Sequence, residues 1–169
     1  MEVIKMVPEV RKILYATDLS VNARYAFGYA ASLAGCFGAG ITVLHVLEEL
    51  SPNAVAIVGN LLGEERWKDV RKKNEDQVIQ SIKDRIGKFC DDMEHKLQEC
   101  SFIIDSVIVE IGHPVDRIIR QAEKNNSDMI VMGSHGQGAL KEAMLGSTSR
   151  RVLRRSEIPV LVIRLPKKD

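Results

Sequence analysis

Residues 128–149 read DMIVMGSHGQGALKEAMLGSTS, and this stretch decides the fold. Its first six residues are almost wholly apolar, which is typical of a short strand buried on both faces of a sheet. A polar, glycine-rich loop follows as far as Gly146, and the segment from Ser147 to Arg155 has the pattern of a short helix. A buried strand, a glycine loop and a helix in this order predict one unit of a parallel α/β sheet.

The same alternation of strands and helices continues on both sides of this unit. Apolar and β-branched runs predict five strands, at residues 11–17, 41–47, 103–111, 128–133 and 159–165. Helical spacing of apolar residues predicts helices after an N-cap at Ser20, across residues 64–99 and from Pro114 to about residue 125, besides the one at 147–155. The stretch 64–99 fits one long helix or two abutting ones, with Gly87 as a weak point. Residues 48–63 are interpreted as a connecting segment.

This order predicts an α/β fold: a single domain over residues 1–169, with a parallel sheet covered by helices on both faces. Right-handed crossovers bring the carboxyl ends of the strands to one edge. Ligands of such sheets bind outside that edge, where the strand order reverses. The segments after Thr17 and after Met132 are therefore the expected binding places.

The overall composition favours a globular protein without a charge bias. The chain has 45% hydrophobic and 28% charged residues, and 24 Lys and Arg against 23 Asp and Glu give a net charge of +1. This balance argues against nucleic-acid binding that is independent of sequence, which usually needs a basic surplus. No apolar run approaches the length of a membrane span, and MEVIKMVPEV at the start lacks the core of a signal peptide.

The three cysteines, Cys36, Cys90 and Cys100, form no CxxC pair. The sequence therefore predicts neither a disulfide framework nor a zinc site, but reduced thiols that pack as small hydrophobic groups. A cytoplasmic location is expected.

The glycine loop has the chemistry that a triphosphate requires. Phosphates are bound by backbone N–H groups, where the chain approaches closely and a helix begins. Gly133, Gly136 and Gly146 can provide the close approach, and residues 147–149 provide hydroxyl groups and the amides of a first helical turn. The alternative is a turn-rich loop in which a serine only caps a helix.

Other polar residues have two interpretations each. Asp18 follows the first strand and can accept from a ribose hydroxyl or meet a metal ion, or it can serve as a loop acid. Ser134 and His135 are adjacent in a loop and are not expected to face one another as a catalytic pair. His135 is interpreted as a phosphate-side or solvent-facing residue, and His45 as a packed or dimer-facing one.

The spacing Gly133-x2-Gly136-x9-Gly146-Ser147 resembles the ATP-binding signature of the universal stress protein family. KILYATDLS at 12–20, TVLHV at 42–46, MGSHGQGALKEAMLGSTSRRVLRRS at 132–156 and IPVLVIR at 158–164 resemble that family in the same order. The resemblance covers nearly the whole chain except residues 48–63.

The resemblance implies a doubly wound, Rossmann-like five-stranded domain with strand order 3-2-1-4-5, and ATP across the carboxyl edge. Asp18 would then contact the adenosine moiety or ribose, and Ile41 would line the adenine pocket. Ala16 stands at the adenine side, where many members carry proline or valine. Met132 and Gly133 would contact the ribose side, and the phosphate ligands would be Gly136, Gly146, Ser147, Thr148 and Ser149. Mg²⁺ or Mn²⁺ is expected to bind through the phosphates and not through a protein-built metal site.

Three functions remain open at this stage. The first is a regulatory, non-catalytic module that holds ATP, and the second is a slow ATPase that acts as a nucleotide-dependent switch. The sequence lacks the GxxxxGK[ST] lysine of P-loop hydrolases and the SGGxDS and HIGH elements of related adenine-binding enzymes, so catalytic residues are not predicted. The third is a scaffold dimer that binds no nucleotide.

The partners expected are a second copy of the chain and an unidentified protein. The family resemblance and the edge-like strand Pro159–Leu165 predict a homodimer through the last strand. Residues 48–63, which the family pattern does not constrain, are the expected location of partner specificity.

Overall fold

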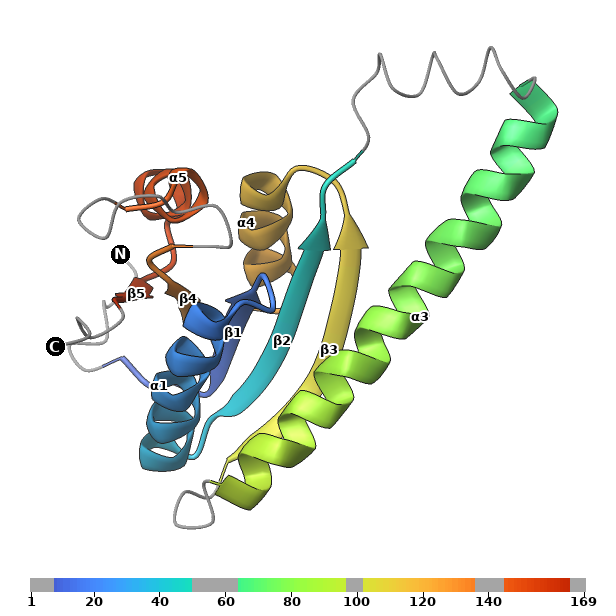
Figure 1. The fold of residues 1–169 in the computed structure, drawn as a ribbon. Coiled ribbons are helices and arrows are strands. Elements are labelled where there is room, and N and C mark those ends of the chain that lie inside the picture. Colours follow the sequence, from blue (N-terminus) through green and yellow to red (C-terminus); the bar gives the residue numbers. More distant parts are fainter. Residues whose placement is uncertain (1–7, 50–63, 97–101, 136–144, 165–169) are drawn as a thin grey trace, which may run out of the picture.

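The computed structural model describes residues 8–49, 64–96, 102–135 and 145–164, which form a parallel sheet covered by helices (Figure 1). The sheet has five strands in the order β3-β2-β1-β4-β5, which confirms the predicted topology. The bounds are β1 (Lys12–Thr17), β2 (Gly40–Leu47), β3 (Ile103–Ile111), β4 (Met129–Gly133) and β5 (Val160–Ile163).

Four helices are described. Three of them connect strands that are neighbours in the sheet, and the fourth connects β3 to β4 on the other side of β1 and β2. They are α1 (Val21–Phe37), α3 (Glu64–Lys96), α4 (Pro114–Lys124) and α5 (Ser147–Arg155). α3 is one continuous helix of 33 residues, so the expected weak point at Gly87 does not interrupt it. Residues 50–63, most of the predicted connector, lie outside the described part.

The side chains of β1 alternate between two cores on opposite faces of the sheet. Ile13 and Tyr15 pack with α1 and α3 on one face, while Leu14 and Ala16 pack with α4 and α5 on the other. All of them are buried, as expected for a central parallel strand. β1 therefore fixes both helical layers and ends at the edge where a ligand is expected.

Helix α1 begins after the N-cap that the sequence predicts and ends at a glycine. The Ser20 hydroxyl accepts a hydrogen bond from the Ala23 amide at 3.2 Å, which is a typical N-cap. Gly38 ends the helix with φ of 64°, a left-handed conformation that favours glycine, and donates to the Ala34 carbonyl. The small residues Ala26, Ala30 and others on the same face let α1 pack closely against the sheet.

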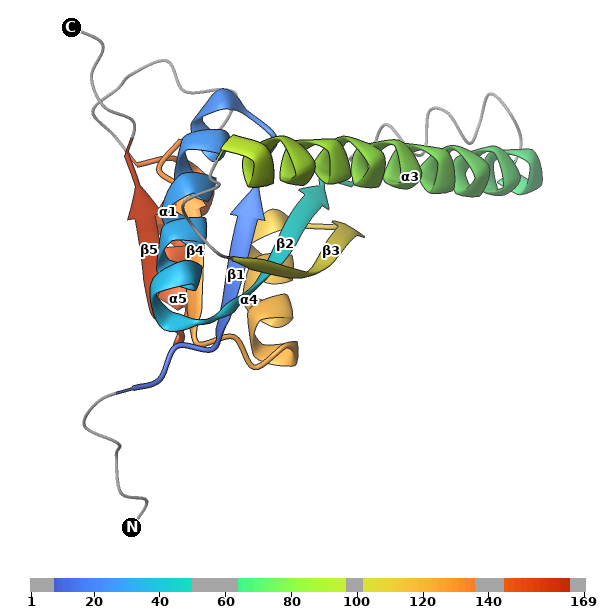
Figure 2. The ribbon, with the colours of Figure 1, turned by 90° about the horizontal axis from the view of Figure 1, so that it is seen from below.

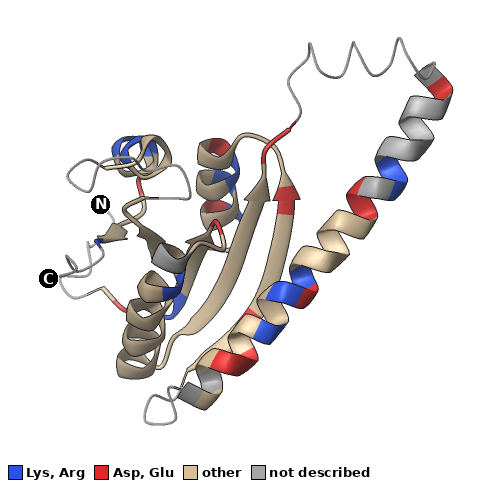
Figure 3. Cartoon of the chain, in the orientation of Figure 1, with Lys and Arg blue, Asp and Glu red and all other residues tan. Residues whose placement is uncertain are grey.

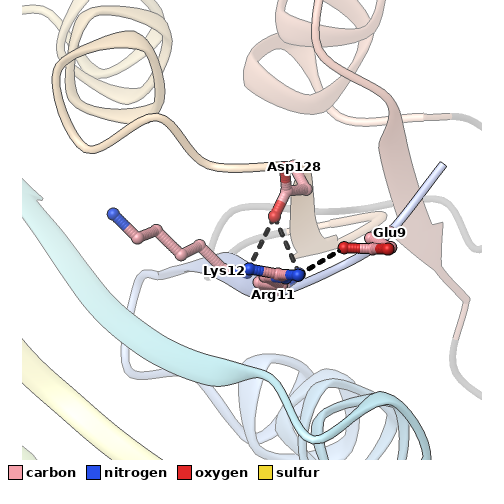
Figure 4. Close-up of polar contacts among 4 residues, drawn as sticks. All are labelled: Glu9, Arg11, Lys12 and Asp128. Carbon is pink, nitrogen blue, oxygen red and sulfur yellow. Dashed lines mark hydrogen bonds and ion pairs between the residues drawn. The ribbon is translucent and has the colours of Figure 1, made fainter. Parts of the chain in front are cut away.

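A polar clamp joins the amino ends of β1 and β4 (Figure 4). The Asp128 carboxylate accepts from the Arg11 and Lys12 amides at 2.8 and 2.9 Å, and the Asp128 amide donates to the Lys12 carbonyl at 2.8 Å. Arg11 also forms an exposed ion pair with Glu9 at 2.6 Å. These bonds align the two strands at the end opposite the expected binding edge.

Only part of α3 packs on the sheet. Ile82, Ile86 and Phe89 are buried against the α1 side, whereas Val78 is 45% exposed. In Figures 1 and 2 the first half of α3 extends beyond β3 and away from the other elements. Among the described residues, no helix is both long and apolar enough to cross a membrane.

Candidate nucleotide site

A cavity of about 580 Å³ opens at the carboxyl ends of β1, β2 and β4. This volume lies in the range of small-molecule and cofactor sites. β1 lies between β2 and β4 in the sheet, so the cavity sits where the strand order reverses. The lining residues come from β1, β2 and β4, from the segments that follow them, and from α1, α4 and α5. They are Ala16, Thr17, Asp18, Ala23, Leu44, His45, Val46, Glu48, Pro114, Ile118, Met132, Gly133, Ser134, His135 and residues 146–149.

The turn between β1 and α1 forms one wall and is fixed by hydrogen bonds within it. The Thr17 hydroxyl accepts from the Leu19 amide, and the Asp18 carboxylate accepts from the Ser20 amide, both at 3.0 Å. Leu19 has φ of 63°, an uncommon conformation for a residue other than glycine. The turn therefore holds Asp18 at the rim of the cavity in a defined position.

β2 contributes a histidine that is tied to this wall. His45 Nδ1 lies 2.8 Å from the Thr17 carbonyl oxygen. Because a carbonyl oxygen only accepts, Nδ1 carries a proton and donates this bond. The contact joins the carboxyl ends of β1 and β2, whose residues Thr17 and His45 are also register partners.

Ser134 connects the opposite wall, between β4 and α5, to the edge strand. Its amide donates to the Ile163 carbonyl at 2.7 Å, and its carbonyl accepts from the Gly146 amide at 2.8 Å and from the Ser149 hydroxyl at 3.0 Å. Ser149 is only 3% exposed, so this hydroxyl locks the start of α5 against the end of β4. A Cβ added to Gly146 would lie 3.1 Å from the Ser134 carbonyl oxygen, so the two segments are in close contact.

The start of α5 lines the cavity with the backbone amides of its first turn. Arg150 donates to the Gly146 carbonyl at 3.0 Å, which is the first hydrogen bond of the helix. The amides of Ser147, Thr148 and Ser149 precede it and have no acceptor within the helix. Together with the helix dipole they favour an anion, and α5 has no acidic residue in its first turn.

Away from α5, the wall of the cavity is apolar and acidic. Ala16, Leu44, Val46 and Met132 provide apolar surface, and the carboxylates of Asp18 and Glu48 lie beside it. Figure 3 shows basic residues on α5 and acidic residues just after β2, on the two sides of this edge. The charge distribution therefore matches a ligand with an anionic end at α5 and a partly apolar end bearing donor groups near β1 and β2.

The sequence profile of the universal stress protein family matches residues 9–164. The chain belongs to this family. It is 30% identical over 154 residues to universal stress protein MJ0577 of Methanocaldococcus jannaschii, covering 91% of this chain and 94% of that protein. The solved structure of MJ0577 superposes with a TM-score of 0.71 at 28% identity and covers 95% of this chain and 100% of that one.

Two further universal stress protein structures contain nucleotides. One is a complex with cyclic AMP, with a TM-score of 0.55 and 19% identity over 93% of this chain and 98% of that one. The other, from Archaeoglobus fulgidus, is a complex with dAMP, with a TM-score of 0.52 and 21% identity over 93% of this chain and 100% of that one. At these identities the likeness shows a shared fold.

Most of the residues that the family resemblance assigns to the site line this one cavity. Those at the nucleoside side are Ala16, Asp18, Met132 and Gly133, and those at the phosphate side are Gly146, Ser147, Thr148 and Ser149. Gly136 lies outside the described residues. The Ser149 hydroxyl is committed to Ser134 and Gly146, so Ser149 is expected to contribute its amide to a phosphate and not its side chain.

Ile41 is corrected by the structure. It is the second residue of β2, is fully buried in the core beneath α1 and α3, and does not line the cavity. Successive strand residues advance about 3.3 Å, so Ile41 lies roughly 16 Å before Val46, which does line the cavity. The part of β2 that lines the cavity is therefore its carboxyl end, where Val46 lies, and not its start.

Several lining residues were not expected from the sequence. His45 had been interpreted as a packed or dimer-facing residue, but it lines the cavity, and so do Glu48 just after β2 and Pro114 and Ile118 of α4. The rule that ligands bind beyond the carboxyl ends of strands would have indicated Val46 and Glu48. Nothing in the local sequence indicates Ile118, which reads as a core residue of an amphipathic helix.

The described residues contain no group of three or more His, Cys, Asp and Glu side chains arranged to hold a metal ion. Cys36 and Cys90 are free thiols, the first exposed and the second buried. Cys100 lies outside the described residues.

Proposed function

We propose that this chain is an ATP-binding regulatory protein, with the triphosphate at the start of α5 and the adenosine between the ends of β1 and β2. The observation that carries the proposal is the start of α5 at residues 147–149, whose amides have no acceptor within the helix and which lines the same cavity as Asp18 and Glu48. Three N–H donors and the helix dipole favour a polyphosphate at the start of α5. The carboxylates of Asp18 and Glu48 disfavour a polyphosphate at the other end of the cavity. The nucleotide-bound structures of two family members are consistent with this ligand class.

The adenosine would lie against apolar side chains at the other end. Ala16 and Met132 are nearly buried in the core on the α4 side, and Val46 lies at the adjoining end of β2. Asp18 and Glu48 are acceptors, so they complement the ribose hydroxyls and an exocyclic amine. Mg²⁺ or Mn²⁺ would be bound through the phosphates and would offset their charge.

The experiment is to purify the protein, denature it, and identify and quantify any released nucleotide by chromatography and mass spectrometry. The test variant is Gly146→Val, because any side chain there would lie against Ser134 and His135. The matched control is Gly28→Ala, whose added Cβ would have no atom within 4 Å. Circular dichroism shows whether each variant is folded.

ATP at about one per chain in the wild type and in G28A, with its loss from folded G146V, supports the proposal. ADP alone would favour the alternative, a slow ATPase that acts as a switch, and a timed hydrolysis assay would then measure turnover. A wild-type protein that releases no nucleotide and takes up no Mg-ATP would contradict both and would favour a scaffold dimer.

A further inference from the structure

A second, smaller cavity lies between α1 and α3, on the face of the sheet where Tyr15 is packed. Its volume is about 40 Å³, and it is lined by Tyr15, Thr17, Leu19, Arg24, Arg85 and Phe89. A cavity needs roughly 10–15 Å³ to hold one water molecule, so this one admits a group of only a few heavy atoms. Of these six residues Thr17 alone also lines the larger cavity, so the two cavities lie on opposite sides of the turn after β1.

The charged residues that line the small cavity are both cationic. They are Arg24 of α1 and Arg85 of α3, and no described carboxylate lines it with them. Neither guanidinium group forms an ion pair or hydrogen bond within the described part of the chain. Asp84, adjacent to Arg85, accepts from Gln80 at 2.9 Å and does not line the cavity. Two cations at one small cavity repel each other, and an anion between them removes this repulsion.

Arg24 is held at the small cavity by an aromatic ring of α3. Its guanidinium carbon lies 5.6 Å from the centroid of the Phe89 ring, within the range of a cation–π contact. Phe89 is buried and makes an edge contact with Phe27 of α1 at 5.0 Å, so its own position is fixed by the core. Figure 2 shows the later part of α3 beside the first turns of α1, where this contact forms.

The hydroxyl groups of the small cavity are already engaged within the protein. The Tyr15 hydroxyl donates to the Ala23 carbonyl, and the Thr17 hydroxyl accepts from the Leu19 amide at 3.0 Å. The guanidinium groups are therefore the main donors left for a ligand. Guanidinium groups bind carboxylates and phosphates through paired N–H donors, and a dianion of the phosphate type offsets both cations at once.

We propose that Arg24 and Arg85 bind a small oxyanion of the phosphate type in this cavity, separately from the nucleotide. Oxygens of the ion accept from Arg24 of α1 and from Arg85 of α3, so the ion joins the two helices. The volume admits such an ion but not a nucleoside, so the ligand is a free ion and not a second nucleotide. Binding of this ion does not require that ATP is bound in the larger cavity.

Titration with inorganic phosphate, followed by ¹H–¹⁵N NMR at pH 7 and at an ionic strength held constant with sodium chloride, tests the site. The variants Arg24→Gln and Arg85→Gln each remove one guanidinium group, and both residues are exposed, so the fold should persist. The matched control is Arg120→Gln, because Arg120 is an exposed arginine of α4, on the opposite face of the sheet. Amide signals of Leu19 and of the two arginines report on the small cavity, and those of residues 147–149 report on the larger one.

Phosphate should shift the amide signals of Leu19, Arg24 and Arg85 along one saturable curve, both in the wild type and in R120Q. R24Q and R85Q should each weaken this binding about 10-fold, because a charge-assisted hydrogen bond is lost. Any shifts at residues 147–149 should be the same in these two variants as in the wild type, which distinguishes the two cavities.

Three results would overturn the inference. The first is a wild type in which Leu19, Arg24 and Arg85 show no saturable shift. The second is a shift confined to residues 147–149, which would place phosphate in the larger cavity only. The third is an equal weakening in R120Q, which would assign the effect to surface charge in general. A protein that binds phosphate at the small cavity but takes up no ATP would contradict the proposed function and leave this site standing.

Discussion

Tyr15 lies fully buried in the middle of β1 and connects the sheet to the wall of the cavity. Its ring makes an edge contact with Phe27 of α1, with a centroid distance of 5.2 Å. Its hydroxyl donates to the carbonyl of Ala23, a residue that lines the cavity. One side chain thus anchors the first turn of α1 from below, and its polar atom is satisfied in the core.

The burial of Tyr15 raises the pKa of its hydroxyl well above the ordinary value near 10.0. The unfolded chain therefore releases this proton at a lower pH than the folded protein. The stability contributed by the neutral phenol is complete below about pH 10 and is lost as the pH rises above it. Urea unfolding from pH 7 to 11 should show a falling free energy of unfolding in this range.

Tyr15→Phe should lower the free energy of unfolding by about 1 kcal/mol at pH 7, because the Ala23 carbonyl loses its donor. The same variant should show a shallower decline above pH 10, since the buried group no longer titrates. Tyr29→Phe is the control, because Tyr29 is 44% exposed and lies outside the core. If the free energy of unfolding declined equally steeply above pH 10 in the wild type and in Y15F, the buried Tyr15 hydroxyl would not be the cause of the decline.

Strand β4 pairs with the central strand β1 and is held in place at both of its ends. At the carboxyl ends Ser134 ties β4 to β5 and to α5, and at the amino ends Asp128 accepts from two consecutive amides of the β1 segment. On the outer face of α4, Arg155 of α5 donates to Asp116 at 2.7 Å and lowers the pKa of that carboxyl. These contacts hold α5 against the end of β4 and against α4.

Asp128→Ala should lower the free energy of unfolding by about 1–3 kcal/mol, because two backbone amides lose a carboxylate acceptor. Glu9→Ala should change it by less than about 1 kcal/mol, since the Glu9–Arg11 pair is exposed. Urea denaturation measures both. ATP affinity should be unchanged in D128A, because Asp128 lies at the opposite end of the strands. A loss of ATP affinity in folded D128A would contradict this, because it would mean that the Asp128 hydrogen bonds influence the cavity at the opposite end of the strands.

The elements themselves were largely predictable from the sequence, because hydrophobic periodicity is local. β3 and α5 match their predicted ranges, and β1, β2, β4 and β5 differ from theirs by one or two residues at the ends. Whether residues 64–99 form one helix or two was left open, and α3 is continuous because one glycine in a long helix costs only about 1 kcal/mol.

The residues of the cavity were predictable only in loops, where polar residues and glycines stand out from the apolar runs beside them. Asp18 and Gly146 belong to segments whose polar and glycine residues interrupt apolar runs. Ile41 was misassigned because both ends of β2 are apolar, and only the direction of the strand distinguishes Ile41 from Val46. Ile118 reaches the cavity through packing of α4 on the sheet, which a single sequence does not reveal.

At the scale of the whole molecule, β5 is an edge strand with apolar residues (Figure 2). The Pro159 carbonyl accepts from Ile130 of β4 at 2.9 Å, and the Ile163 carbonyl accepts from Ser134, just after β4, at 2.7 Å. Backbone groups alternate in direction along a strand, so those of Val160 and Val162 point away from β4. We propose that a second copy of the chain pairs with this edge, as the family resemblance also implies.

Val162→Pro removes one outward amide without removing a bond to β4, so it should convert the dimer to monomer at micromolar concentration. Val162→Thr keeps that amide and should remain dimeric. Analytical ultracentrifugation measures both, and circular dichroism checks the fold. A wild type that is monomeric at micromolar concentration, or a folded V162P that remains dimeric, would contradict pairing through β5.

The first half of α3, which extends beyond β3, should unfold locally more easily than the rest of the molecule. The helix rises about 1.5 Å per residue, so its 33 residues extend about 50 Å, whereas the eight residues of β2 extend about 26 Å. Among the described side chains of α3, those packed in the core lie in its second half and include Ile82, Ile86 and Phe89. Hydrogen–deuterium exchange should therefore slow progressively from residue 64 toward residue 90. A protease should cut first within residues 64–80, and the sheet and its cavity should remain folded after this cut.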